Sequence, residues 1–271
     1  MTGRIRDYLE MRGQRVTVLI KEKDWKDDAS RENPEEDADV PAGVDCMIVL
    51  GGDGTVLRAA RETKKLQIPI IGVNLGTLGY MTEIEPSGLE EALDRLIAGD
   101  YIQERRMMLN GRVCLADGGT KEGWALNDIV ISRSGSLQII KFNIYVNGQF
   151  LNDYDADGMI VTTPTGSTGY NLSAGGPLIE PKAKLIMLTP ICPHTLNQRS
   201  IILSPEDVIE IEIPQGREGR AQTVEANFDG SHKIALETGD VIRIVKSEKS
   251  TDFIQLNQVS FLELLHKKMS E

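Results

Sequence analysis

The sequence has few cysteines, few aromatic residues and no long hydrophobic run. Its three cysteines, Cys46, Cys114 and Cys192, are odd in number and far apart, so they form neither a disulfide framework nor a zinc-ligand pattern. Aromatic residues make up only 5% of the chain, which disfavours stacking platforms for single-stranded nucleic acid. No apolar run has the length of a transmembrane helix, and no signal segment opens the chain. These absences predict a cytoplasmic protein that binds no membrane.

Positive charge is also scarce. Lys and Arg number 30 against 41 Asp and Glu, which gives a formal net charge of −11. A surface of that sign repels phosphate backbones and disfavours nucleic-acid binding. The acidity concentrates in residues 22–39, which carry Pro34 and almost no apolar side chain, a composition that predicts a solvated loop.

Helix and strand patterns alternate in the first hundred residues. Three short apolar runs predict buried strands, at 16–20, 44–50 and 69–73, and three longer stretches predict helices, at 5–11, 56–66 and 89–98. Continuous apolar strands between helices indicate a parallel sheet covered on both faces. We therefore expect residues 1–100 to form an α/β nucleotide-binding domain.

After about residue 100 the pattern changes to short strands separated by turn signals such as Asn147-Gly148 and Asp229-Gly230. Strands are expected at 113–116, 129–132, 142–146, 159–163, 185–188, 201–203, 208–213, 222–226 and 241–245. Residues 101–258 are thus predicted to form a second, all-β domain that resembles a β-sandwich. A closing helix, within residues 259–271, is expected to return to the first domain.

The sharpest local feature is the segment Leu50-Gly-Gly-Asp-Gly-Thr55, between a predicted strand and a predicted helix. Its glycines allow close backbone approach, and its amides with the helix N-terminus form an anion cradle. Asp53 places a carboxylate in this cradle. Such a carboxylate indicates a chemical role, either accepting a proton from a substrate hydroxyl or orienting that hydroxyl for attack. The alternative is that Asp53 caps the helix and the glycines only form a turn.

Two further segments are rich in polar groups. Asn127-Asp128 places an amide beside a carboxylate, a pair that can hydrogen-bond a ribose or an adenine edge. Residues 162–176 are dense in hydroxyl groups and glycines, which suits a loop that fits closely around a nucleotide. An Asx turn and a plain glycine-rich connection are the alternatives.

Together these segments resemble those of the NAD kinase family. The GGDGT loop is shared with 6-phosphofructokinases and with diacylglycerol and sphingosine kinases, but three other segments match NAD kinases in order and spacing: ALNDIV around Asn127, DGMIVTTPTGSTGY from Asp157, and PICPHT from Pro190. The resemblance implies transfer of the γ-phosphoryl group of ATP to the 2′-hydroxyl of NAD's adenosine ribose, which forms NADP. A catalytically impaired dinucleotide-binding homologue and a lipid or sugar kinase are the alternatives.

The resemblance also implies roles for individual residues. Asp53 is the implied catalytic residue, Tyr80 falls beside the adenine, and Asp157 meets the nicotinamide end. Many relatives have a basic residue where this chain has Asp155. The residues predicted to bind the dinucleotide are Gly52, Asp53, Gly54, Arg58, Tyr80, Asn127, Asp128, Gln138, Asp155, Asp157, Thr165, Thr168, Gly169, Tyr170, Asn171, Leu172 and Ser173.

The family pattern carries three further expectations. A divalent metal ion, Mg²⁺, is implied by ATP rather than by any metal-ligand spacing. Self-association into a dimer or tetramer through the β-rich domain is expected. Relatives begin with a strand and an Asn-Pro turn, whereas here the helix predicted at residues 5–11 follows Met1 almost at once, so we expect the family's first strand to be missing.

Overall fold

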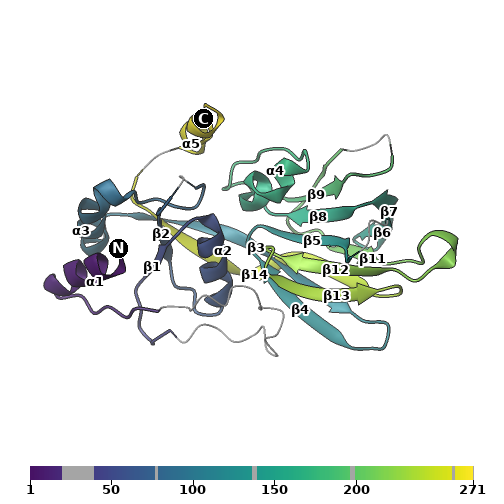
Figure 1. Ribbon diagram of the computed structural model, residues 1–271, viewed down its shortest axis with the longest axis horizontal. Helices are drawn as coiled ribbons and strands as arrows, with labels where there is room; N and C mark the ends of the chain where they lie inside the picture. The colour runs from purple at the N-terminus through teal and green to yellow at the C-terminus, as the bar shows by residue number, and fades with distance from the viewer. Residues whose placement is uncertain (20–39, 77–78, 136–138, 196–198, 258–259, 271) are drawn as a thin grey trace. The chain divides into compact units, whose positions relative to one another are not determined.

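The computed structural model describes residues 1–19, 40–76, 79–135, 139–195, 199–257 and 260–270. The chain divides into two units: Met1–Arg105 with Thr251–Glu271, and Arg106–Ser250 (Figure 1). The acidic segment 22–39, predicted to be a loop, and Gln138, predicted to bind the dinucleotide, lie outside the described residues.

The first unit contains parallel strands, as its sequence predicts. β1 (Met47–Leu50) pairs in parallel with β2 (Ile70–Val73), and the end of β14 (Val241–Gln255) pairs in parallel with β2 through Phe253 and Ile70. The strand predicted at residues 16–20 is wrong for its described part, because residues 16–19 form no strand. Val18 and Leu19 are exposed, so this apolar run is not buried in a sheet.

Helices accompany these strands. They are α1 (Thr2–Met11), α2 (Asp53–Glu62) and α3 (Leu89–Ala98), with a short 3₁₀ turn, η2 (Pro86–Gly88), before α3. Ile5 of α1 and Leu93 of α3 share one buried cluster with Ile71 of β2. Burial of these apolar faces fixes β1 and β2, and so the loop that joins β1 to α2.

The C-terminal segment belongs to the first unit. Ile254 joins the buried cluster of that unit. Helix α5 (Phe261–Met269) begins at a capping box formed by Ser260 and Glu263. No described residue of α5 is buried, so its packing onto the first domain stays a prediction. No helix in the described part of the chain is long and apolar enough to cross a membrane.

The second unit consists of two sheets. One is antiparallel throughout, in the order β10-β9-β8-β5-β12-β13. Its strands are β5 (Asp128–Arg133), β8 (Gly158–Thr162), β9 (Ile186–Ile191), β10 (Ile201–Leu203), β12 (Thr223–Phe228) and β13 (His232–Glu237). The other contains β3 (Ile102–Cys114), β4 (Thr120–Ala125), β6 (Ile140–Val146), β7 (Gln149–Ala156), β11 (Ile209–Glu212) and β14. A 3₁₀ turn, η4 (Arg217–Gly219), precedes β12.

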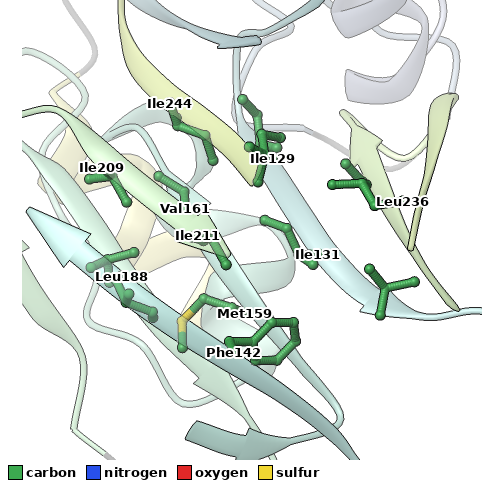
Figure 2. Close-up of a cluster of buried hydrophobic side chains, with 14 of the residues drawn as sticks. Ile129, Ile131, Phe142, Met159, Val161, Leu188, Ile209, Ile211, Leu236 and Ile244 are labelled. Carbon is green, nitrogen blue, oxygen red and sulfur yellow. The ribbon is translucent and has the colours of Figure 1, made fainter. Parts of the chain in front are cut away.

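Alternate residues of both sheets form one buried core, as Figure 2 shows. Ile129 and Val161 come from the first sheet, and Phe142 and Ile211 from the second. Two sheets that share a core in this way form a sandwich, which confirms the predicted fold class.

Two predicted turns close hairpins of this unit. Asn147 and Gly148 join β6 to β7 with φ of 52° and 76°, and Asp229 and Gly230 join β12 to β13 with φ of 49° and 69°. Both residues of each pair have positive φ, as the two central residues of a type I′ turn require. They form the whole connection between β6 and β7, whereas Ser231 lengthens the β12–β13 connection to three residues. The second turn places Asp229 next to the start of β5, because Phe228 pairs with Ile129.

Candidate active site

In the first unit, the carboxylate of Asp53 is held by a distant loop. Asp53 is the first residue of α2, and Gly52 is the N-cap. Oδ2 of Asp53 accepts the backbone N–H of Tyr80 at 2.8 Å, and Oδ1 accepts that of Met81 at 3.0 Å. Asp53 therefore does not cap α2, so the part of the alternative that makes it the N-cap is wrong. The negative charge of Asp53 lies in the first turn of α2, where the positive end of the helix dipole stabilises it.

Gly79 makes this contact possible. A Cβ atom at Gly79 would lie 2.6 Å from Cγ of Asp53 and 2.9 Å from its Oδ2. Side chains do not tolerate such a separation, so the loop can approach the carboxylate only with glycine at this position.

Two other predicted residues belong to the same elements as this contact: Arg58 lies in α2, and Tyr80 lies in the loop that binds Asp53. Nε of Arg58 is 2.7 Å from Oε1 of Glu62, one helical turn further along, and both side chains are largely buried. Burial and the charge of Asp53 raise the pKa of the Tyr80 hydroxyl. Nζ of Lys268 lies 5.9 Å from the centroid of the Tyr80 ring. Phosphate binding by Arg58 and adenine contact by Tyr80 stay predictions.

In the second unit, a distant carboxylate binds the backbone N–H groups of the turn at Asn127 and Asp128. The carboxylate of Asp229 accepts three consecutive backbone N–H groups, from Leu126 at 2.9 Å, Asn127 at 2.8 Å and Asp128 at 3.2 Å. The backbone N–H of Asp229 in turn donates to the carbonyl of Asp128 at 3.0 Å.

The same turn is held from its carbonyl side. The hydroxyl of Thr163 donates to the carbonyl of Leu126 at 2.6 Å, and the hydroxyl of Thr162 donates to that of Asn127 at 3.0 Å. Gly166 and Gly169 approach closely, and a Cβ at Gly169 would lie 3.3 Å from Nδ2 of Asn127. The structure therefore brings the predicted Asn127-Asp128 pair and the predicted hydroxyl-rich loop together.

Two features of the Asn127-Asp128 pair are unusual. Oδ1 of Asn127 is buried and, within the described residues, has no hydrogen-bond partner. The side chain of Asp128 is also buried, and burial, followed by the charge of Asp229, raises its pKa to about 7. Buried polar atoms are normally hydrogen-bonded, so Oδ1 of Asn127 is suited to accept a donor from a ligand.

The hydroxyl-rich loop divides into a buried and an exposed part. It contains the 3₁₀ turn η3 (Thr165–Thr168) and the short helix α4 (Tyr170–Ser173). Thr165 is buried and accepts a hydrogen bond from Arg106 at 3.4 Å. Thr168 and Gly169 are partly exposed, and Tyr170, Leu172 and Ser173 are exposed.

Asn171 differs from its neighbours because it is fully buried. Its amide donates to the carbonyls of Ser167 and Pro177, and its Oδ1 accepts the hydroxyl of Thr189 at 2.7 Å. Both amide hydrogens are thus used within the protein. This side chain shapes the loop, whereas the neighbouring side chains on α4 are open to a ligand.

Asp155 and Asp157 both pair with arginines. Nη1 of Arg133 lies 2.9 Å from Oδ1 of Asp157, and both side chains are partly exposed. Nη2 of Arg217 lies 3.5 Å from Oδ2 of Asp155. Positive charge therefore stands beside both carboxylates.

The sequence-based set of residues omitted several side chains that shape these sites. Asp229, Thr162, Thr163 and Arg133 hold predicted residues in place. The signal for Asp229 in the sequence was the Asp229-Gly230 turn motif. Within the described residues, no group of three or more His, Cys, Asp and Glu side chains is placed to hold a metal ion.

Family models match both parts of the chain. The model for the ATP-NAD kinase N-terminal domain matches residues 6–101, and the model for the ATP-NAD kinase C-terminal domain matches residues 126–256. A protein of Lachnospira eligens named NAD kinase is 49% identical over 239 residues, which cover 85% of this chain and 82% of that protein. The chain belongs to the ATP-NAD kinase family. This confirms the family that the sequence motifs indicate, and no comparison favours a lipid or sugar kinase.

Other members of the ATP-NAD kinase family extend the likeness over the full chain. An NAD kinase of Agathobacter rectalis is 46% identical over 269 residues, which cover 99% of this chain and 93% of that protein. The crystal structure of an NAD kinase from Archaeoglobus fulgidus in complex with ATP has 27% identity and a TM-score of 0.78, and covers 100% of this chain and 95% of that one. Yeast NADH kinase complexed with NADH has 28% identity and a TM-score of 0.77, over 84% of this chain and 66% of that one.

Proposed function

We propose that this chain transfers the γ-phosphoryl group of ATP to the 2′-hydroxyl of the adenosine ribose of NAD and releases NADP. The GGDGT loop alone does not select this acceptor, because several kinase families share it. The observation that carries the proposal is the turn at Asn127 and Asp128, to which Thr162 and Thr163 tie the glycine-rich loop. Family membership over both units supports the same conclusion.

Asp53 acts on the 2′-hydroxyl, either by accepting its proton or by orienting it for attack on phosphorus. The backbone N–H groups of Tyr80 and Met81 support this role because they fix the direction of the carboxylate. Each oxygen keeps a lone pair for a hydroxyl group. The first turn of α2, with Gly52 and Gly54, favours the negative charge of a phosphate.

The adenosine end of NAD binds at Asn127 and Asp128. The buried Oδ1 of Asn127 accepts from an amino or hydroxyl group, and the carboxylate of Asp128 accepts from the ribose. The hydroxyl-rich loop completes this surface with Thr165, Thr168, Gly169, Tyr170, Leu172 and Ser173. The buried Asn171, also predicted at this site, contributes by holding the loop through its bonds to Pro177 and Thr189.

Asp157 accepts from the carboxamide of the nicotinamide end, and Arg133 holds its carboxylate in place. We retain the prediction that four further residues contact the dinucleotide: Asp155, Gln138, Arg58 and Tyr80.

A divalent metal ion would arrive with ATP, since within the described residues no group of three or more metal-ligating side chains is placed to hold one. Mg²⁺ commonly uses one or two carboxylates together with substrate phosphates and water, and Asp53 is the carboxylate that would hold it. When bound, the ion neutralises charge that develops on the transferring phosphoryl group.

Self-association through the second unit is part of the proposal, as is a cytoplasmic location. Ile202 lies on the edge strand β10 and is exposed, and exposed apolar groups on an edge favour pairing with a second copy. Light scattering gives the test. A mass near the 29.9 kDa of one chain, with full activity, would exclude an obligate oligomer.

The experiment that tests the function measures NADP formation from NAD and ATP with the purified chain and Mg²⁺. We expect turnover that requires both substrates. Parallel reactions with diacylglycerol and fructose 6-phosphate should give no phosphorylated product. NAD binding without turnover would instead identify a catalytically impaired homologue.

A further inference from the structure

Asp229 combines three properties that make it more than a turn residue. It occupies a positive-φ position in the β12–β13 turn, it lies about a hundred residues beyond Asn127 in the chain, and its carboxylate accepts the three N–H groups of Leu126, Asn127 and Asp128. A carboxylate is the strongest acceptor that a side chain offers to backbone N–H groups.

These bonds act on the segment that carries the ligand-binding side chains. The carbonyls of Leu126 and Asn127 are already fixed by Thr163 and Thr162. With the N–H groups also fixed, the backbone of residues 126–128 is held on both sides. A fixed backbone fixes the Cα–Cβ directions of Asn127 and Asp128, and so the point from which each side chain extends.

An acidic residue at this position carries an electrostatic cost. Asp128 is buried, and the second carboxylate close to it disfavours its ionisation. A neutral acceptor such as Asn would avoid this repulsion but would lose one acceptor oxygen, because its amide nitrogen only donates. The presence of Asp therefore indicates that holding all three N–H groups outweighs the repulsion.

We propose that Asp229 is a positioning residue for NAD, which fixes Asn127 and Asp128 by collecting the three N–H groups before and within their turn. The inference rests on the proposed function, since it assigns the adenosine end of NAD to these two side chains. Asp229 itself does not contact the reacting atoms.

The test compares Asp229→Asn with a matched control, Asp240→Asn. Asp240 is another aspartate of the second unit. It is buried, whereas Asp229 is partly buried, and its carboxylate accepts the backbone N–H groups of Ala116 and Glu237, both at 2.8 Å. Both variants lose one acceptor oxygen. Only Asp229 is tied to the Asn127-Asp128 turn, so a general loss of stability affects both variants and a loss of positioning affects one.

We expect Asp229→Asn to raise the KM and the dissociation constant for NAD by about tenfold to a hundredfold, the range for a lost charge-assisted hydrogen bond. kcat and the KM for ATP should stay within about threefold of wild type, because the interaction lost is a binding one. Asp240→Asn should keep the wild-type KM for NAD. An unchanged KM for NAD in Asp229→Asn, or an equal rise in both variants, would overturn the proposal.

If Asp229→Asn does not fold, hydrogen exchange in the wild-type chain tests whether Asp229 holds the backbone of residues 126–128. We expect slow exchange of the backbone amides of Leu126, Asn127 and Asp128, because all three donate to Asp229. Exchange as fast as that of exposed loop amides would refute the positioning role. Hydrogen exchange does not depend on turnover. A wild-type chain that forms no NADP would contradict the proposed function. The exchange rates of the three amides would still show whether Asp229 holds the turn.

Discussion

The carboxyl group of Asp128 is buried beside the carboxylate of Asp229, and burial, followed by this like charge, raises the pKa of Asp128 to about 7. Desolvation and a like charge both disfavour the ionised form of an acid. Asp128 therefore changes its charge near neutral pH, and it does so inside the proposed NAD site.

NAD binding should therefore depend on pH. Ionised Asp128 accepts hydrogen bonds more strongly than the protonated acid, so we expect affinity for NAD to improve as pH rises through about 7. Calorimetry between about pH 5.5 and 8.5 measures this, because ionisation of the group approaches completion about one unit above its pKa. Asp128→Asn should bind NAD weakly and without this pH dependence. A wild-type affinity that is flat over the range would contradict the role of Asp128.

The same pKa predicts a stability difference. Since the pKa of Asp128 is higher in the folded chain than its ordinary value of 3.8, its contribution to stability is complete below about pH 4 and is lost as pH rises through about 7. At pH 8 the ionised group costs as much as roughly 4 kcal/mol. Asp128→Asn stays neutral, so its melting temperature should exceed that of wild type at pH 8 and approach it at pH 5. Equal melting temperatures at pH 8 would rule this out.

Much of the fold is predictable from the sequence, and the omissions have a common physical cause. The strand predicted at 142–146 lies in β6, where buried residues alternate as in a sandwich strand. The strand predicted at 129–132 lies in β5, whose first four residues are all buried and form an apolar run after Asp128. The strands that the sequence did not indicate, β4, β7 and β13, each pair with one neighbour among the described residues. Outer strands carry polar side chains, which weakens the hydrophobic pattern. Residues 16–19 show the reverse error, since an apolar run did not become a strand.

The site was predictable where a residue type carried the chemistry. The glycines around Asp53 and the adjacent Asn127 and Asp128 are visible as short motifs. The role of Asp229 was not, because it acts through backbone N–H groups from a position 101 residues beyond Asp128. Hydrogen bonds to the main chain leave no pattern in the side chains of their partners.

Asp53→Asn tests the proposed chemistry. Asn cannot accept a proton from the 2′-hydroxyl, so kcat should fall by about two to four orders of magnitude, the range for a general base. NAD affinity should stay near that of wild type, because the lost interaction belongs to the transition state. Stopped assays of NADP formation give kcat, and calorimetry gives the affinity. The matched control is Asp94→Asn, which changes an exposed carboxylate of the same unit that pairs with Arg12. Wild-type turnover in Asp53→Asn would exclude the role.

Gly79→Ala tests whether the position of the Asp53 carboxylate matters. The new Cβ would lie 2.6 Å from Cγ of Asp53, so the carboxylate must move and lose its bonds to the N–H groups of Tyr80 and Met81. Overpacking of this kind costs about 1–3 kcal/mol of stability. We expect kcat to fall by about a hundredfold, as small displacements of a catalytic group do, while the charge of Asp53 is unchanged.

Gly76→Ala is the control for this variant, because it lies in the same loop and a Cβ there would meet nothing within 4 Å. It should keep wild-type kcat and melting temperature. Both variants make the same chemical change, so a difference between them isolates the contact with Asp53. If Gly79→Ala retains wild-type kcat while its melting temperature falls, the loop contributes only to stability, and the two N–H bonds to Asp53 do not set the geometry of phosphoryl transfer.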